Sequence, residues 1–144
     1  MRSARLSLGL LTIIPVGAIG DVDRRMARSA MLWAPAVGIL LGALGAAVLL
    51  IVRALVPSPL GALLAAALAL TSLAYLTRAL HLDGLADTAD ALGSGKEAAA
   101  ALDIARRGDV GPFGVVTLVL ALLVQITALA VAIEAGKGAI ALLL

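Results

Sequence analysis

The sequence predicts an all-α protein, a polytopic integral membrane helical bundle with a charged helical loop on its cytoplasmic side. Hydrophobic residues make up 62% of the 144 residues and charged residues only 14%, and the mean hydropathy is +1.13. In soluble domains, hydrophobic residues make up roughly 45–50% of the chain and charged residues about 25%. Six of the nine acidic residues fall within residues 78–111. We therefore treat residues 1–144 as a single membrane domain organised around that window.

The first apolar segment, residues 6–19, is short and interrupted by two glycines and a proline. As a helix it would reach only about 21 Å, whereas the hydrocarbon core is about 30 Å thick. We predict a re-entrant or interfacial segment, which is tolerated where protein or water covers its broken backbone. Arg2 and Arg5 followed by a short apolar run also fit a signal peptide cleaved after residues 18–20, so that alternative stays open.

Three longer apolar stretches predict membrane spans at about residues 30–52, 60–77 and 113–133. The first contains Gly38 and Gly42, a G-x-x-x-G spacing that favours close helix contact, although glycine is common throughout this chain. Each stretch is long enough to cross the bilayer, and together they predict a bundle of at least three helices.

The distribution of Lys and Arg predicts the topology. Arg53 and Lys137 lie on one side of the spans, whereas most basic residues lie on the other: Arg24, Arg25, Arg28, Arg78, Lys96, Arg106 and Arg107. By the positive-inside rule, the charged window then faces the cytoplasm, as expected in an inner membrane. Residues 139–144 begin another apolar segment as a partial span, so we expect the chain to be part of a longer protein.

The centre of the charged window carries three aspartates, Asp83, Asp87 and Asp90, at i, i+4 and i+7. On a helix they share one face. At an effective dielectric near 20, two unit charges ~6 Å apart repel by roughly 3 kcal/mol, so a cation among them is favoured. Oxygen ligands without cysteine favour Mg²⁺ or Mn²⁺, and Mg²⁺ commonly bridges to a phosphate. The sequence therefore predicts a magnesium site, with a solvated helix face as the alternative.

A second helix is expected at about residues 96–107, after the break at 93–95. Ser94 and Glu97 form an S-x-x-E capping box, and Gly108 supplies a left-handed stop.

The window also offers groups for phosphate chemistry. Arg106 and Arg107 could clamp a metal-bound phosphate, and Arg78 and Asp109 are candidate substrate contacts. His81 could act as a general base, because imidazole titrates near working pH, although a histidine at the end of a span is often an ordinary interfacial residue. The reaction class indicated is a phosphoryl-linked group transfer without a familiar nucleotide-binding motif.

Two observations limit the partners. The chain has no cysteine, which excludes disulfides and thiolate metal sites. The pI near 9.7 comes from basic residues that flank apolar segments, so they indicate topology and lipid contact rather than a nucleic-acid partner.

Two runs carry a resemblance to a known family: TRALHLDGLADTADALG at 77–93 and LDIARRGDVGPFG at 102–114. With residues 8–16 and 28–42, they resemble cobalamin synthase, the adenosylcobinamide-GDP ribazoletransferase family. The resemblance implies an Mg²⁺-dependent inner-membrane enzyme that joins α-ribazole or its 5′-phosphate to adenosylcobinamide-GDP and releases GMP. It also implies that the family's acidic motif falls on the three aspartates. In the second run, many members of that family have an acidic residue followed shortly by a basic one. This chain departs from that pattern, because Arg107 precedes Asp109.

Two alternatives remain beside the resemblance. The run beginning at Asp83 is similar to part of the motif of CDP-alcohol phosphotransferases, but their later glycine and paired aspartates are missing at the required spacing. A cation-binding transporter subunit is the non-enzymatic alternative, and it predicts carboxylates buried in mid-span. A homo-oligomer is compatible with any of these.

Overall fold

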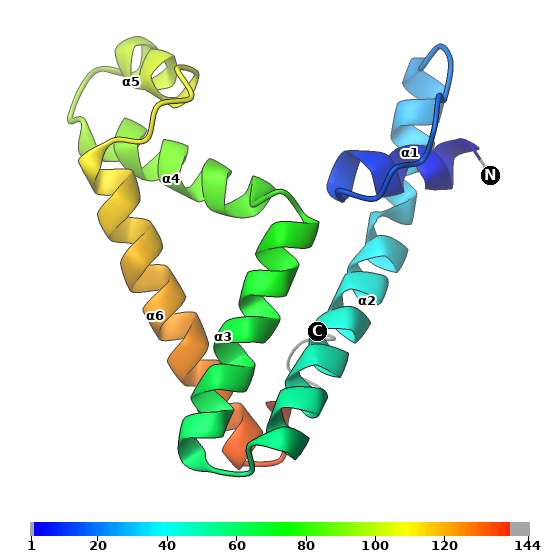
Figure 1. Ribbon diagram of the computed structural model, residues 1–144. Coiled ribbons are helices and arrows are strands. Elements are labelled where there is room, and N and C mark those ends of the chain that lie inside the picture. Colours follow the sequence, from blue (N-terminus) through cyan, green and yellow to red (C-terminus); the bar gives the residue numbers. More distant parts are fainter. Residues whose placement is uncertain (1, 139–144) are drawn as a thin grey trace.

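The computed structural model describes residues 2–138, which form helices and connecting loops and contain no β-strand. The helices, shown in Figure 1, are α1 (Arg2–Leu11), α2 (Arg24–Leu55), α3 (Pro59–Leu76), α4 (Leu80–Gly93), α5 (Ala98–Ala105) and α6 (Pro112–Glu134). The predicted all-α membrane bundle is confirmed. The partial span predicted at 139–144 lies outside the described residues.

Three of these helices, α2, α3 and α6, are long and apolar enough to cross a membrane. Their bounds agree closely with the expected spans except at the start of α2. That helix begins at Arg24, six residues before the apolar run, because the Asp23 side chain accepts a hydrogen bond from the N–H of Met26 at 2.6 Å and caps it. The basic residues that precede the span are therefore helical.

The core lies where α2, α3 and α6 converge, at the lower end of the view in Figure 1. It is rich in alanine, which lets the helix backbones approach closely; its buried residues are Leu49, Ala62, Ala65, Ala66, Ala69, Leu129, Ala130 and Ile133. An ion pair of 3.0 Å between Arg53 Nη2 and Glu134 Oε1 joins the ends of α2 and α6 beside this core.

The contact between α2 and α3 differs from the G-x-x-x-G prediction. Gly42 is buried, but a side chain at Gly38 would meet open space. The two helices approach closely at Gly45, where an added Cβ would lie 3.1 Å from the side chain of Leu73. Within residues 2–138, the predicted close contact is therefore not formed at Gly38, where α2 and α3 have diverged (Figure 1).

At the opposite end of the bundle the helices spread apart (Figure 1). There α4 bridges from α3 to α6, α5 lies above α4, and α1 lies across α2. The segment predicted at 6–19 becomes helix α1 followed by an irregular loop, and the loop is joined to α3 by a 2.8 Å hydrogen bond from Ile13 N–H to Leu76 O.

The predicted capping box of the second helix is wrong. Helix α5 begins at Ala98, and its N-cap Glu97 makes no side-chain capping bond. The Ser94 hydroxyl instead donates to Ala91 O at 2.7 Å, at the end of α4. Gly95 has a φ of 62°, which is incompatible with a helix starting there. Gly108 has the predicted left-handed conformation, with a φ of 70°. Helix α5 nevertheless ends earlier, at Ala105 with Arg106 as its C-cap, so Gly108 is not the residue that stops the helix.

Candidate functional site

The charged window begins at a sharp turn between α3 and α4. Arg78 and Ala79 have φ values of 53° and 54°, a left-handed conformation that costs a residue with a side chain roughly 1–2 kcal/mol. The Arg78 guanidinium supports this turn, because its Nη2 donates to Gly9 O at 2.8 Å and Thr12 O at 2.7 Å, at the end of α1. Arg78 therefore anchors α1 to the start of α4, and its predicted substrate contact stays a prediction.

The three aspartates lie on α4, outside the three candidate spans, but their environments differ. Asp83 is exposed, Asp87 is half-buried and Asp90 is only 7% exposed. In residues 2–138, no hydrogen bond or ion pair engages the side chain of Asp83 or Asp87. The same residues contain no group of three or more carboxylate or histidine side chains arranged to hold a metal ion together.

Asp90 binds the beginning of α6. Its Oδ2 accepts a hydrogen bond from Gly111 N–H at 2.7 Å, and its Oδ1 accepts one from Gly114 N–H at 2.9 Å. Gly111 is the N-cap of α6, which has no side-chain cap of its own, so Asp90 satisfies donors that would otherwise be unpaired. The positive end of the helix dipole also favours a carboxylate at this place.

The two glycines are required by this contact. A Cβ on Gly111 or on Gly114 would overlap the Asp90 carboxylate, and Gly114 also lies against the backbone of Ala86. Because neither position leaves space for a side chain, the first turn of α6 can approach α4 closely enough for both hydrogen bonds.

Around this contact lies a cavity of about 210 Å³ between α4, α5 and the loop that leads to α6. Its lining residues are Asp90, Ser94, Ile104, Arg107, Asp109, Gly111, Pro112 and Phe113. The structure thus brings Arg107 and Asp109 together with Asp90, whereas Arg106 does not line the cavity. We call this the α4–α6 cavity.

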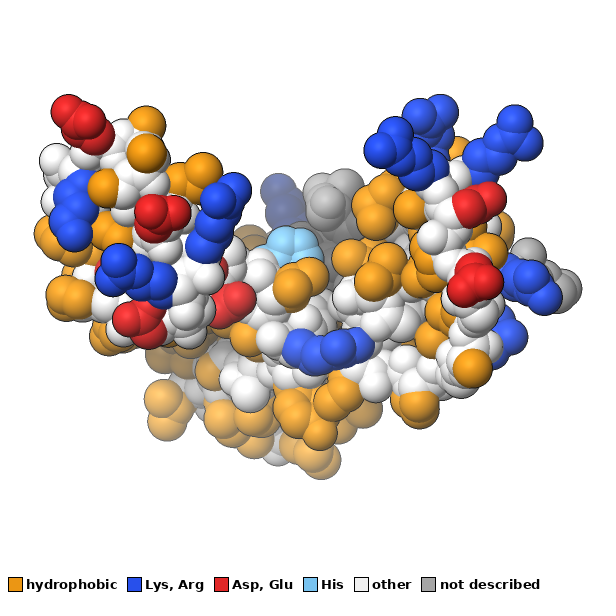
Figure 2. Space-filling view, turned by 90° about the horizontal axis from the view of Figure 1, so that it is seen from above, with side chains coloured by type: hydrophobic (Ala, Val, Ile, Leu, Met, Phe, Trp, Pro, Cys, Tyr) orange, Lys and Arg blue, Asp and Glu red, His pale blue; other side chains and the backbone are white. Residues whose placement is uncertain are grey.

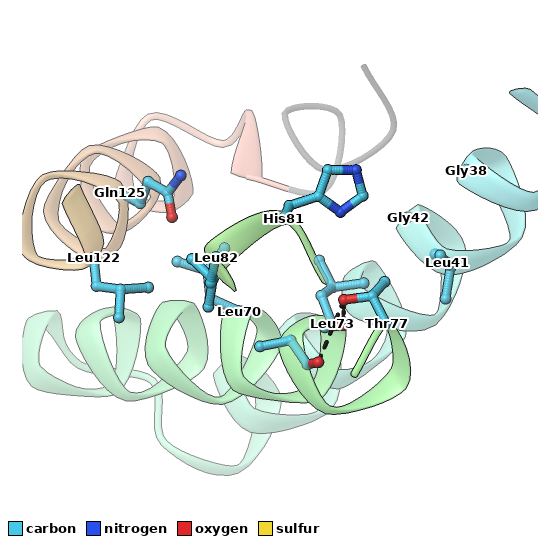
Figure 3. Close-up of a pocket in the computed structure, with 11 residues that line it drawn as sticks. Gly38, Leu41, Gly42, Leu70, Leu73, Thr77, His81, Leu82, Leu122 and Gln125 are labelled. Carbon is cyan, nitrogen blue, oxygen red and sulfur yellow. Dashed lines mark hydrogen bonds between the residues drawn. The ribbon is translucent and has the colours of Figure 1, made fainter. Parts of the chain in front are cut away.

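His81 lines a separate cavity of about 300 Å³ between α2, α3, α4 and α6 (Figure 3). Most of its lining is apolar, and its polar side chains are His81, Thr77 and Gln125. The Thr77 hydroxyl is already bonded to Leu73 O at 2.9 Å. The two cavities share no lining residue, so His81 and the predicted arginines are not brought into one pocket.

Figure 2 shows the open end of the bundle from above. Charged side chains gather on two arms, one formed by α4 and α5 and the other by α1 and the start of α2. Hydrophobic side chains, the histidine and a basic side chain lie between the arms. We call this open end, which carries both arms, the charged face of the molecule.

Sequence reasoning missed three contributors. The sequence shows that Gly111 and Gly114 lie at the start of an apolar helix. It does not show that they contact Asp90, which lies more than 20 positions earlier. Gln125 was evident only as a polar residue in an apolar span, and its place in the His81 cavity depends on how the helices cross.

Comparison with known proteins identifies the family. Residues 3–144 match the family model described as cobalamin-5-phosphate synthase. The chain is 38% identical to an adenosylcobinamide-GDP ribazoletransferase of Frankia casuarinae, over 99% of this chain and 53% of the relative. It is 44% identical to the protein of that name from a Nocardioides species, over 93% of this chain and 58% of the relative.

A third relative of the same name, from Ectopseudomonas mendocina, is 39% identical over 96% of this chain and 55% of its own length. The chain spans about half the length of the curated relatives it matches. No solved structure matches it. The charged α4 segment and the bundle that carries it belong to a member of the cobalamin-5-phosphate synthase family.

Proposed function

We propose that this chain supplies part of the active site of an adenosylcobinamide-GDP ribazoletransferase, with the charged face on the cytoplasmic side of the inner membrane. In this reaction a ribose hydroxyl of α-ribazole, or of its 5′-phosphate, forms a bond to the phosphorus next to cobinamide. The bond from that phosphorus to GMP breaks, and the hydroxyl loses its proton. The relatives' name and the family match support this assignment.

The observation that carries the proposal is the pair of free carboxylates on α4. Asp83 and Asp87 stand one helical turn apart, and no hydrogen bond or ion pair in the described residues engages either side chain. This fits Mg²⁺, which is commonly held by one or two carboxylates together with substrate phosphates. When bound, the ion would supply neutralisation of the diphosphate charge.

Asp90 has less capacity to act as the third ligand predicted from the sequence. Both of its oxygens already accept backbone hydrogen bonds and the side chain is buried. We therefore propose that Asp83 and Asp87 are the direct ligands and that Asp90 positions α6.

The remaining site residues lie at opposite ends of α4. From His81 to Asp90 the helix rises by about 13 Å. We propose that Arg107 binds phosphate oxygens of the nucleotide at the α4–α6 cavity, where it lies with Asp109. His81, at the other end, accepts the proton of the ribose hydroxyl at a ring nitrogen. Arg106 does not line this cavity, so we propose that it makes a weaker, longer-range electrostatic contribution.

The free carboxylates lie on α4 rather than within a candidate span, which counts against the transporter alternative, because that reading needs carboxylates buried in mid-span.

The test is a chimera in which residues 1–138 replace the matching half of the Nocardioides relative, purified in detergent. We expect GMP release that requires adenosylcobinamide-GDP, α-ribazole phosphate and Mg²⁺, and that is lost in Asp87→Asn. A monodisperse chimera that releases no GMP, beside an active parent, would refute the proposal.

A further inference from the structure

A third cavity, of about 270 Å³, lies between α1 and the loop that follows it and is lined by Arg2, Arg5, Ala18, Ile19 and Gly20. Both charged residues in this lining are cationic. Within residues 2–138, neither arginine forms an ion pair. The cavity shares no residue with the two cavities beside α4, so the proposed transfer reaction leaves it without a role. We call it the α1 cavity.

Local structure builds this cavity around Arg5. The Thr12 hydroxyl donates to Leu8 O at 2.6 Å and accepts from Ile14 N–H at 3.1 Å, which turns the chain back at the end of α1. The returning loop then reaches Arg5, whose guanidinium donates two hydrogen bonds to Val16 O, the one from Nε at 3.1 Å.

Two glycines complete the loop. Gly17 and Gly20 have φ values of 69° and 76°, which other residues rarely adopt. Since a guanidinium has five N–H donors, Arg5 keeps three for another partner while its plane is held in a fixed orientation. The α1 cavity is therefore a preorganised cationic site rather than two freely moving side chains.

The surroundings of the cavity place it at a membrane surface. Exposed apolar side chains lie on α1, on the loop that follows it and on the upper part of α2: Leu10, Ile13, Met31, Leu32 and Trp33. Tryptophan is enriched at the membrane–water interface. Three more arginines open α2, namely Arg24, Arg25 and Arg28, and the arm they form is rich in basic side chains in Figure 2.

From these observations we infer that the α1 cavity binds the phosphate of an anionic phospholipid, with Arg2 and Arg5 as its ligands. A phosphate matches the geometry of a guanidinium fork and can accept two parallel hydrogen bonds from it. Anionic lipids are concentrated in the cytoplasmic leaflet, to which the positive-inside rule assigns this face. The volume is slightly below the range of about 300–1,000 Å³ for small-molecule sites, which suits a lipid head group better than a whole nucleotide.

The site would also fix α1. Because α1 is joined to the start of α4 through Arg78, a lipid phosphate held at Arg5 keeps the end of that helix next to the charged window.

The test uses the 144-residue chain in nanodiscs of phosphatidylcholine with or without phosphatidylglycerol. Retained phosphatidylglycerol is measured by native mass spectrometry after transfer to detergent. Arg2→Gln and Arg5→Gln should each weaken its retention by about tenfold or more, the effect of losing a hydrogen bond between charged groups. Arg24→Gln is the matched control, since it removes the same charge outside the cavity and should retain the lipid like the unchanged chain.

Arg2→Gln keeps the test valid if Arg5→Gln disturbs the loop, because Arg2 makes no side-chain hydrogen bond within the described residues. If Arg24→Gln lost phosphatidylglycerol to the same extent, the lipid would be held by the overall positive charge of this arm rather than by the α1 cavity, and the inference would be overturned. Retention of phosphatidylcholine equal to that of phosphatidylglycerol would also overturn it. Displacement of the lipid by inorganic phosphate or GMP at low concentration would instead assign the site to a soluble phosphate and also overturn it.

Discussion

The carboxylate of Asp90 on α4 accepts a hydrogen bond from the backbone N–H of Gly114, in the first turn of α6, over 2.9 Å. Together with the bond from Gly111, it fixes the angle at which the third span meets the charged helix. Asp90, the last of the three aspartates along α4, therefore connects α4 to the start of α6.

Removing this carboxylate should destabilise the protein. Asp90→Ala leaves two N–H groups at the start of α6 without a partner, at a cost of about 1–3 kcal/mol. Unfolding in increasing denaturant, followed by circular dichroism in detergent, measures this difference. Asp83→Ala is the control, because Asp83 is exposed and should change stability by no more than about 0.5 kcal/mol. Equal stability of the two variants would contradict the connecting role.

A methyl group at Gly114 should be destabilising for a related reason. In Gly114→Ala the new Cβ overlaps the Asp90 carboxylate and crowds Ala86, and overpacking costs about 1–3 kcal/mol. Gly84→Ala is the matched control within α4, since nothing lies within 4 Å of its Cβ position. It should be neutral or stabilising by up to about 1 kcal/mol.

The double variant Asp90→Ala with Gly114→Ala tests the same contact independently. Because the smaller side chain removes part of the overlap, the two losses should be less than additive. Strict additivity would mean that the two residues do not interact.

Loss of the Arg78 guanidinium should loosen α1. Arg78→Gln cannot reproduce the bonds to Gly9 and Thr12, so we expect faster hydrogen exchange of the backbone amides in residues 9–14. The amides of α6 should keep their protection, which is the internal control. Unchanged exchange at residues 9–14 would show that Arg78 does not hold α1.

The orientation of the bundle can be tested by labelling. Ser94 lies at the end of α4 and Ser58 at the turn between α2 and α3, so they lie at opposite ends of the bundle. The arginine distribution predicts that a cysteine at position 94 reacts with an impermeant reagent only from the cytoplasmic side, and one at position 58 only from the other side. The reverse pattern would overturn the proposed topology.

Much of the fold could be predicted from the sequence because each span is a long apolar run. The three spans could be predicted without knowledge of tertiary contacts, since length and hydropathy alone distinguish them from the rest of the chain. The left-handed conformation of Gly108 was predictable for a similar local reason.

The rest depended on contacts between distant segments. The stripe of Asp83, Asp87 and Asp90 follows from helical spacing, but the spacing does not reveal that Asp90 turns toward Gly111 and Gly114. Ser94 and Glu97 satisfy the capping-box pattern, yet the φ of Gly95 shifts the helix start beyond them. Likewise, Arg106 and Arg107 are adjacent in sequence, and only the packing of α5 against α4 separates their roles.

The central claim is that Asp83 and Asp87 serve the chemistry whereas Asp90 serves the structure. Its most direct test is the Mg²⁺ dependence of GMP release by the chimera, measured for Asp83→Asn, Asp87→Asn and Asp90→Asn. Loss of a ligand charge should raise the half-saturating Mg²⁺ concentration by about tenfold or more in the first two variants. Asp90→Asn should lower the rate and the stability while leaving that concentration unchanged. A shift for Asp90→Asn as large as that for Asp87→Asn would contradict this division and restore Asp90 as a metal ligand.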